Sequence, residues 1–313
     1  MRALVTGATG FVGRHLCRFL RANGHDVFAF GGPAHSHTAV LDVLHEQRVF
    51  AAIRSSHPDV VFHLAAQTFV PDTVASPLET YKVNILGAAH VARAIARHVE
   101  NSGERSRLVF ASSAEVYGRV SSDLFPLRES TPTNPRNPYA ASKASAESIL
   151  KAEHHTFGLD VVICRPFNNI GPGPQGHFAI PNFAMQLAKI ELGAPKQISV
   201  GNLDARRDFL DVRDVVAAYV LLAEFGVSGE TYNICSGVPR SMRSVLDALV
   251  QIAGHDIDIV EDPSRMRPAS TPESVGDNAK LQSATGWEPQ LSIDASLRDV
   301  YAAALESSRG VFP

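Results

Sequence analysis

Short apolar runs alternate with amphipathic segments through the first half of the chain. Five of these runs are rich in apolar and β-branched residues and lie at residues 3–6, 27–30, 60–64, 108–112 and 161–164. Continuously apolar runs of this length are typical of strands that are buried on both faces, as in a parallel sheet. The alternation of strand and helix predicts an α/β fold with a doubly wound parallel sheet and right-handed crossovers.

Three segments between these runs predict helices. The first has apolar side chains at positions i, i+4, i+7 and i+8, which share one helical face: Val12, Leu16, Phe19 and Leu20. Gly24 is placed to end this helix in a left-handed conformation. Residues 79–98 and 139–157 predict two longer helices.

The regular alternation ends after Cys164. Residues 165–176 contain three prolines and three glycines, which predicts a loop rather than a helix or a central strand. Helical and strand-like signals then mix without strict alternation. We therefore expect a first domain at residues 1–165 with a later contribution from about 207–235. A smaller, mixed α/β domain is expected at 166–206 and 236–313.

Composition indicates a globular protein with a sizeable core. The chain has 313 residues, of which 45% are hydrophobic and 19% charged. A net charge of −3 does not favour a general nucleic-acid-binding surface. The longest apolar stretch, at 215–223, is far shorter than the ~18 residues of a membrane span, and the opening residues do not resemble a signal peptide. These features predict a soluble, cytoplasmic protein that binds no membrane.

The three cysteines are Cys17, Cys164 and Cys235, and each lies in an apolar context. They give neither a disulfide framework nor the spacing of metal ligands, so we expect no metal site.

A glycine-rich turn, residues 6–13 (TGATGFVG), lies directly between the first predicted strand and the first predicted helix. Glycine lets the backbone approach a pyrophosphate, and the following helix offers N–H groups and the positive end of its dipole. Any tight strand–helix turn uses glycine, but the flanking strand and helix favour dinucleotide binding. The expected cofactor-binding residues of this turn are Gly7, Thr9, Gly10, Phe11, Val12 and Gly13.

The end of the second predicted strand lacks the acidic residue that usually binds the ribose of NAD. The chain has Phe30-Gly31-Gly32 there, with Arg14 nearby. Without a carboxylate at this point a 2′-phosphate is not repelled. The sequence therefore favours NADP(H) and leaves NAD(H) open.

Tyr139 and Lys143 are four residues apart in a predicted helix, so their side chains share one face. An ammonium group about 4–5 Å away favours the phenolate, and we expect it to lower the pKa of Tyr139 from about 10 toward about 7 before burial opposes the shift. The phenol would then act as an acid or base near neutral pH. This spacing also occurs by chance in helices, so the pair requires a third member.

Ser113 supplies that third member. It follows the strand at 108–112, and the carboxyl edge of an α/β sheet is where ligands bind. A hydroxyl at this edge can hold a substrate carbonyl while Tyr139 delivers a proton. The alternative is a strand-end hydroxyl that bonds only to the backbone.

Together these motifs resemble the extended short-chain dehydrogenase/reductase (NAD-dependent epimerase/dehydratase) family over essentially the whole chain. Further matches are Leu41-Asp42-Val43, His63-Leu64-Ala65-Ala66 and Asn84. The resemblance implies a Rossmann-type fold in which Ser113, Tyr139 and Lys143 are catalytic. It also implies that Asp42 binds the adenine amino group of the cofactor and that the segment after His63 contacts the cofactor. Asn84 would contact the cofactor too, and would brace the active-site helices and a proton relay. The contacts of that segment involve Leu64, Ala65 and Ala66.

The second half narrows the resemblance to GDP-4-keto-6-deoxy-mannose reductases, which form GDP-D-rhamnose. The matching segment is residues 165–173 (RPFNNIGPG), supported by stretches near residues 67, 200, 232 and 262. By this resemblance Asn168 contacts the substrate, and Arg207 and Arg267 reach its diphosphate. A structural ion pair of Arg207 with Asp208 or Asp211 is the alternative.

Glu115 matches the position of the catalytic glutamate in the related dehydratases, so it is a further substrate-binding candidate. The favoured reaction is reduction of a GDP-4-keto-6-deoxy sugar, because the loop after Asn168 lacks the arginine usual in dehydratases. Two alternatives stay open. One is a GDP-mannose 4,6-dehydratase with Glu115 as base and tightly held NADP, and the other is a non-catalytic dinucleotide-sensing protein. The helices at 79–98 and 139–157 resemble those that pair as a four-helix bundle in this family's homodimers.

Overall fold

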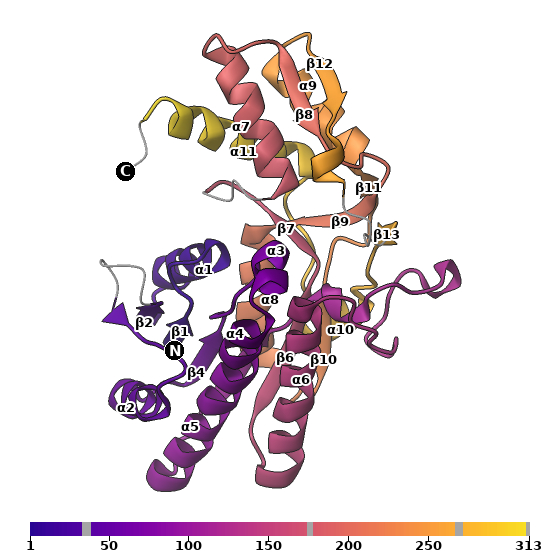
Figure 1. The fold of residues 1–313 in the computed structure, drawn as a ribbon. Coiled ribbons are helices and arrows are strands. Elements are labelled where there is room, and N and C mark those ends of the chain that lie inside the picture. The colour runs from indigo at the N-terminus through magenta and orange to yellow at the C-terminus, as the bar shows by residue number, and fades with distance from the viewer. Residues whose placement is uncertain (33–38, 174–177, 267–271, 311–313) are drawn as a thin grey trace.

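A seven-stranded parallel sheet forms the centre of the molecule (Figure 1). The computed structural model describes residues 1–32, 39–173, 178–266 and 272–310. The strand order is β10–β6–β5–β4–β1–β2–β3, which confirms the predicted doubly wound parallel sheet. The strands are β1 (Arg2–Thr6), β2 (Asp26–Gly31), β3 (Ala39–Val40), β4 (Val60–His63), β5 (Arg107–Ala111), β6 (Val161–Pro166) and β10 (Thr231–Ile234).

Helices cover both faces of this sheet, which explains why its strands are apolar without interruption. Along β1, Ala3 and Val5 pack into the core on one face, whereas Leu4 packs into the core on the other. The first face is covered by α1 (Phe11–Ala22), α8 (Val212–Phe225) and α10 (Ala279–Thr285). The second face is covered by α2 (Glu46–Ser56), α5 (Gly87–Ser102) and α6 (Pro138–Phe157).

Both predicted long helices are present and lie side by side in Figure 1. The first is a continuous helical run made of α4 (Pro77–Tyr81), the π-helical segment η1 (Lys82–Leu86) and α5, and it follows the short helix α3 (Val70–Ala75). α6 begins where the side chain of Asn137 accepts a hydrogen bond from the Ala140 N–H at 2.8 Å.

The predicted loop at 165–176 is wrong over its first part. β6 continues through Pro166, and residues Asn168–Ile170 form β7, which pairs in parallel with β9 (Arg206–Asp211). Proline is tolerated because it is the last residue of the strand, and the next N–H, that of Phe167, donates to the Ile234 carbonyl at 2.9 Å. Residues 174–177 lie outside the described residues.

A smaller lobe of mixed helices and strands follows β6 at the carboxyl edge of the sheet (Figure 1). β9 pairs with β7, β11 (Pro239–Ser241) and β13 (Glu273–Ser274), and β8 (Gln197–Val200) pairs with β12 (Asp258–Glu261). The lobe has its own apolar core. Its helices are α7 (Ala179–Glu191), α9 (Met242–Ala253) and α11 (Ile293–Ser308). The 3₁₀ segments within the described residues are η2 (Ala114–Tyr117), η3 (Ser122–Leu124) and η4 (Pro263–Arg265).

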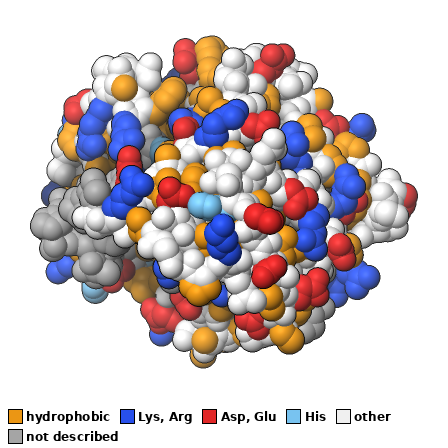
Figure 2. Space-filling view, turned by 90° about the horizontal axis from the view of Figure 1, so that it is seen from above, with side chains coloured by type: hydrophobic (Ala, Val, Ile, Leu, Met, Phe, Trp, Pro, Cys, Tyr) orange, Lys and Arg blue, Asp and Glu red, His pale blue; other side chains and the backbone are white. Residues whose placement is uncertain are grey.

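Charges are mixed on the face shown in Figure 2, where basic and acidic side chains lie between scattered hydrophobic ones. None of the helices in the described part of the chain is long and apolar enough to cross a bilayer. All three cysteines are buried and carry free thiols.

Candidate active site

The glycine turn packs tightly against the segment that follows β4. Gly7 has φ +71°, and a Cβ there would lie 2.7 Å from the backbone nitrogen of Ala65. A Cβ on Gly13 would lie 2.2 Å from the carbonyl oxygen of Gly7. The fold itself therefore requires glycine at these two positions, one for the turn and one for the approach of α1 to the strand.

Gly10 differs from the other two glycines. A Cβ built there meets one described neighbour within 4 Å, the Gly7 carbonyl oxygen at 3.2 Å. Gly10 is also the N-cap of α1 and gives no side-chain acceptor to the N–H groups of the first turn. Of the three glycines, Gly10 is the one that packing requires least, and it lies beside N–H groups of α1 that have no side-chain acceptor. This arrangement suits the close approach of a phosphate group.

The segment 64–66 is held to β1 through two side chains. The hydroxyl of Thr6 lies 2.7 Å from Nδ1 of His63 and accepts a hydrogen bond from the Ala65 N–H at 3.3 Å. Burial and the charge of Lys143 lower the pKa of His63 to about 3, so its ring is neutral. Leu64 and Ala65 line the turn from the side of β4, where their backbone lies within 3 Å of a Cβ built on Gly7, and Ala66 follows them in the chain.

Asp42 lies just after β3, at the same sheet edge as the turn. Its Oδ1 accepts a hydrogen bond from the Leu44 N–H at 2.9 Å, and Oδ2 lies 3.8 Å from Nε2 of His45. The carboxylate is about one-third exposed, so it can reach a ligand as well as its own turn.

Asn84 joins three segments from within η1. Its amide donates to the Gln67 carbonyl at 3.0 Å and to the Ser142 hydroxyl at 2.9 Å, while Oδ1 accepts from the Gln67 N–H at 2.8 Å. The side chain is buried. It therefore connects the segment after β4 to α6, one residue before Lys143.

Ser113, Tyr139 and Lys143 meet at the carboxyl end of β5. Ser113 hydrogen-bonds with the phenol of Tyr139 and accepts a hydrogen bond from the Glu115 N–H at 3.1 Å. Lys143 donates from Nζ to the Ala111 carbonyl at 2.7 Å. All three side chains are buried. The alternative role for Ser113 was a hydroxyl bonded only to the backbone. The structure has the backbone hydrogen bond, from the Glu115 N–H, and the contact with Tyr139 as well.

The predicted lowering of the pKa of Tyr139 is wrong for this structure. Burial raises the pKa of Tyr139 to about 12, the charge of Glu115 raises it further, and the hydrogen bond with Ser113 opposes them. Burial also lowers the pKa of Lys143 to about 8, against the charge of Glu147. The spacing of Tyr139 and Lys143 did not reveal that both side chains are removed from water. The phenol is therefore a proton donor at neutral pH.

A buried polar cluster under this site was not predicted from the sequence. The carboxylate of Glu147 accepts hydrogen bonds from the Ser112 hydroxyl at 2.5 Å and from Arg165 at 2.9 and 2.6 Å. The Arg165 guanidinium lies 4.8 Å from the ring centre of Tyr117, whose hydroxyl donates to Asn233 at 2.6 Å. Glu147 follows Lys143 by one helical turn, and this spacing was the one feature of the sequence that could have indicated a buried carboxylate near the site.

Glu115 and Arg207 lie close to Tyr139 on the side of the smaller lobe. Glu115 is exposed, accepts a hydrogen bond from the Asn137 amide at 3.3 Å, and its charge raises the pKa of both Tyr139 and Arg207. Burial is the larger effect on Arg207 and lowers its pKa. The structure thus brings these three predicted residues together.

Arg207 does not form the ion pair considered as its alternative role. Asp208 accepts hydrogen bonds from the N–H groups of Ser236 and Gly237, and Asp211 pairs with Arg213 at 2.8 Å. Arg207 donates to two backbone carbonyls, at 2.8 and 3.4 Å. Within the described ranges no carboxylate is ion-paired with it, so its guanidinium retains donors for an anionic ligand.

Asn168 is placed on β7, beside β9. Its amide donates to the Asp208 carbonyl at 3.2 Å, which ties β7 to the strand that carries Arg207. Arg267, the second predicted diphosphate ligand, lies outside the described residues.

Comparison with known proteins gives consistent matches over nearly the whole chain. The family described as GDP-mannose 4,6 dehydratase matches residues 4–300. GDP-6-deoxy-D-mannose reductase from Pseudomonas aeruginosa is 38% identical over 96% of this chain and 95% of that protein. The structure of RMD from the same organism, complexed with NADPH, matches with a TM-score of 0.85 and 35% identity, covering 98% and 100% of the two chains. UDP-glucose 4-epimerase from Thermus thermophilus, in complex with NAD, matches with a TM-score of 0.84 and 29% identity, covering 97% and 99%.

Proposed function

Because the chain belongs to the GDP-mannose 4,6 dehydratase family, we propose that it reduces GDP-4-keto-6-deoxy-D-mannose to GDP-D-rhamnose. The chain is an NAD(P)-dependent enzyme of the extended short-chain dehydrogenase/reductase family. The observation that carries the proposal is the contact of Ser113 with the buried phenol of Tyr139, with the buried amine of Lys143 one helical turn further along α6. Similarity to a reductase over nearly the full length of both chains supports the choice of reaction.

The residues present fit a nicotinamide dinucleotide. The turn at Gly10 and the first N–H groups of α1 would hold the pyrophosphate, Asp42 the adenine, and Tyr139 and Lys143 the nicotinamide ribose. When bound, the reduced cofactor supplies a hydride. We propose NADPH because β2 ends without a carboxylate and a similar structure holds NADPH, while a more distant neighbour holds NAD.

Tyr139 would donate its proton to the substrate oxygen at C4. Its raised pKa keeps the phenol protonated at neutral pH, and a developing alkoxide is a stronger base than the phenolate. The Ser113 hydroxyl accepts a hydrogen bond from the Glu115 N–H, so it can donate its own hydrogen to the same oxygen. The ammonium of Lys143 would stabilise negative charge as it develops.

The smaller lobe would bind the sugar nucleotide. Arg207 is not ion-paired with a carboxylate among the described residues and would bind the diphosphate through its guanidinium, together with Arg267. Asn168 and Glu115 would contact the sugar. The placement of Glu115 near both Tyr139 and Arg207 supports this assignment.

The same placement of Glu115 favours a second candidate, the GDP-mannose 4,6-dehydratase reaction. An exposed carboxylate beside the phenol could remove a proton next to a transient ketone. This reaction returns its hydride, so it consumes no external reductant. The requirement for added NADPH separates the two reactions.

The deciding experiment supplies purified protein with GDP-4-keto-6-deoxy-D-mannose and NADPH, then with NADH. We expect oxidation of NADPH in step with formation of GDP-D-rhamnose. A parallel reaction with GDP-mannose and no reductant should yield no product. A 4-keto product in that reaction, with no reduction of the keto sugar, would establish the dehydratase instead. The absence of both reactions would favour the non-catalytic dinucleotide-sensing alternative.

We also propose a homodimer formed through the helical run at 77–102 and α6, acting in the cytoplasm. These helices lie side by side, and Leu78 and Leu86 in the first of them are exposed. Sedimentation at increasing protein concentration tests the dimer.

A further inference from the structure

A group of three potential metal ligands lies at the edge of the sheet opposite to the candidate active site. His57 ends α2 just before β4, His98 lies in α5, and Glu104 precedes β5. Their ligand atoms all lie within 4.8 Å of one another. β4 and β5 begin beside these residues, so the group lies at the amino ends of the two strands. The carboxyl ends of the same strands lead to Leu64 and Ser113, in the candidate active site.

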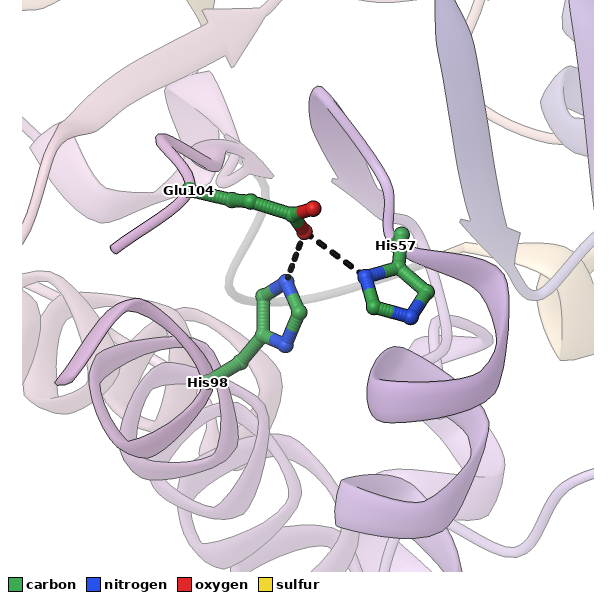
Figure 3. A group of neighbouring side chains, drawn as sticks. All are labelled: His57, His98 and Glu104. Carbon is green, nitrogen blue, oxygen red and sulfur yellow. Dashed lines mark hydrogen bonds and ion pairs between the residues drawn. The ribbon is translucent and has the colours of Figure 1, made fainter. Parts of the chain in front are cut away.

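Both imidazole rings point toward the carboxylate of Glu104 (Figure 3). Nδ1 of His57 lies 2.7 Å from Oε2 of Glu104, and Nε2 of His98 lies 3.3 Å from the same oxygen. The two rings are 5.4 Å apart and meet edge to face. Each ring therefore presents one nitrogen to a shared point.

The His98 nitrogen is the independent sign of a ligand. The His98 side chain is only 2% exposed, and its Nε2 has one described polar contact, the 3.3 Å approach to Glu104 Oε2, which lacks the geometry of a good hydrogen bond. A buried nitrogen with one poorly aligned contact is incompletely satisfied, and a bound cation would satisfy its lone pair. His57 and Glu104 are 43% and 50% exposed, so a cation and a completing water have access.

We propose that His57, His98 and Glu104 bind one Zn²⁺ ion, with water as the fourth ligand. Two imidazoles and one carboxylate are a ligand set that zinc accepts in tetrahedral geometry. Bonds of about 2.1 Å separate tetrahedral ligand atoms by about 3.4 Å. The contact from His98 to Glu104 already has this length, and the contact from His57 must widen by less than 1 Å. The ion replaces the proton of the hydrogen bond between His57 and Glu104, and that proton is released.

The ion would join the end of α2, the body of α5 and the turn before β5. None of its ligands touches the residues assigned to reduction, so it would act on stability and not on the reaction. This separates the metal proposal from the proposed function, because either can fail without the other.

The test uses tag-free, chelator-treated protein titrated with Zn²⁺ by calorimetry and followed by thermal unfolding. We expect one ion per chain and a melting temperature raised by about 3–5 °C at a hundredfold excess of zinc over its dissociation constant. Glu104→Gln keeps the size of the side chain and should weaken binding at least about 10-fold. His98→Asn should do the same, and cobalt(II) in place of zinc should give visible absorption in the wild type alone.

The matched control is Glu191→Gln. His255 and Glu191 form another contact of 2.7 Å between an imidazole and a carboxylate, in the smaller lobe, outside any described group of three such ligands. This variant should bind zinc like the wild type, and Glu104→Gln should keep the basal reductase activity. No zinc uptake by the wild type, or equal uptake by wild type and Glu104→Gln, would overturn the proposal.

Discussion

The carboxylate of Glu147 accepts two hydrogen bonds from the guanidinium of Arg165, at 2.9 and 2.6 Å, and both side chains are only 4% exposed. The same carboxylate accepts a third from Ser112, the residue before Ser113. Glu147 thus ties α6 to the ends of β5 and β6, and it holds the helix that carries Tyr139 against the strand that leads to Ser113.

Glu147→Gln should be strongly destabilising. Removing one partner of a buried ion pair leaves the other charge uncompensated, which costs about 3–5 kcal/mol of the free energy of unfolding. The control is Glu153→Gln on the same helix, whose partner Arg93 is 51% exposed, and it should cost about 0–1 kcal/mol. Urea unfolding of both variants measures the difference. An equal loss of unfolding free energy in the two variants would show that the buried ion pair stabilises the protein no more than the exposed one.

The pH dependence of turnover should report Lys143. Burial lowers the pKa of this amine to about 8, so its ammonium is lost as the pH rises through 8, well before the Tyr139 phenol ionises at about 12. We expect kcat/KM to be highest below pH 8 and to fall above it. In Lys143→Arg the side chain stays charged, and the alkaline fall should disappear from whatever activity is left. A profile unchanged by this substitution would assign the fall to another group.

Much of the fold follows from local patterns, because the periods of strands and helices are properties of short segments. The five predicted strands and the helices around residues 12–20, 79–98 and 139–157 are present. β7 was missed because its residues lie between prolines and glycines, and its pairing with β9 depends on a segment some 40 residues away.

The part of the candidate site that a short segment determines could also be predicted from the sequence. The four-residue spacing of Tyr139 and Lys143 placed them on one face of a helix. Their ionisation depends on burial, which the whole fold determines, so its direction for Tyr139 was wrong. The ion pair of Glu147 with Arg165 joins a helix to a strand, and no local pattern contains it. The domain boundaries stay a prediction.

Glycine-to-alanine substitutions should separate packing from cofactor binding. A Cβ on Gly13 would lie 2.2 Å from a backbone oxygen, so Gly13→Ala should lower the melting temperature markedly. Gly10→Ala places its methyl group 3.2 Å from the Gly7 carbonyl oxygen, a tight contact that a small shift relieves, so it should destabilise the fold far less than Gly13→Ala. Its methyl group would stand where the pyrophosphate must approach, so NADPH binding should weaken about 10-fold or more. Fluorescence titration with NADPH, with unfolding curves alongside, tests both; normal NADPH affinity in Gly10→Ala would contradict the assignment.

Arg207→Gln should raise KM with little effect on kcat. The loss of charged hydrogen bonds to a diphosphate corresponds to about 1.5–3 kcal/mol, or roughly a 10- to 100-fold higher KM, when the contact is the same in ground and transition states. Stability should change little, because no described carboxylate is ion-paired with Arg207. Arg206→Gln is the control from the same strand, where the exposed side chain pairs with Glu273 at 3.6 Å, and its KM should stay near that of the wild type. Equal effects of the two substitutions would argue against a specific diphosphate contact.

Tyr139→Phe tests the proton donor directly. The variant loses one hydroxyl from a buried ring and keeps the packing of α6. The glycine turn, Asp42 and Lys143 remain to hold the cofactor, so NADPH should still bind with nearly normal affinity. Loss of a general acid typically lowers turnover by about 10²–10⁴. Tyr81→Phe, at the end of α4, provides a matched loss of a phenol outside the proposed site and should leave turnover unchanged. Steady-state rates and NADPH titrations of the two variants test this. If Tyr139→Phe turns over at close to the wild-type rate, the proton reaches the sugar oxygen from another group.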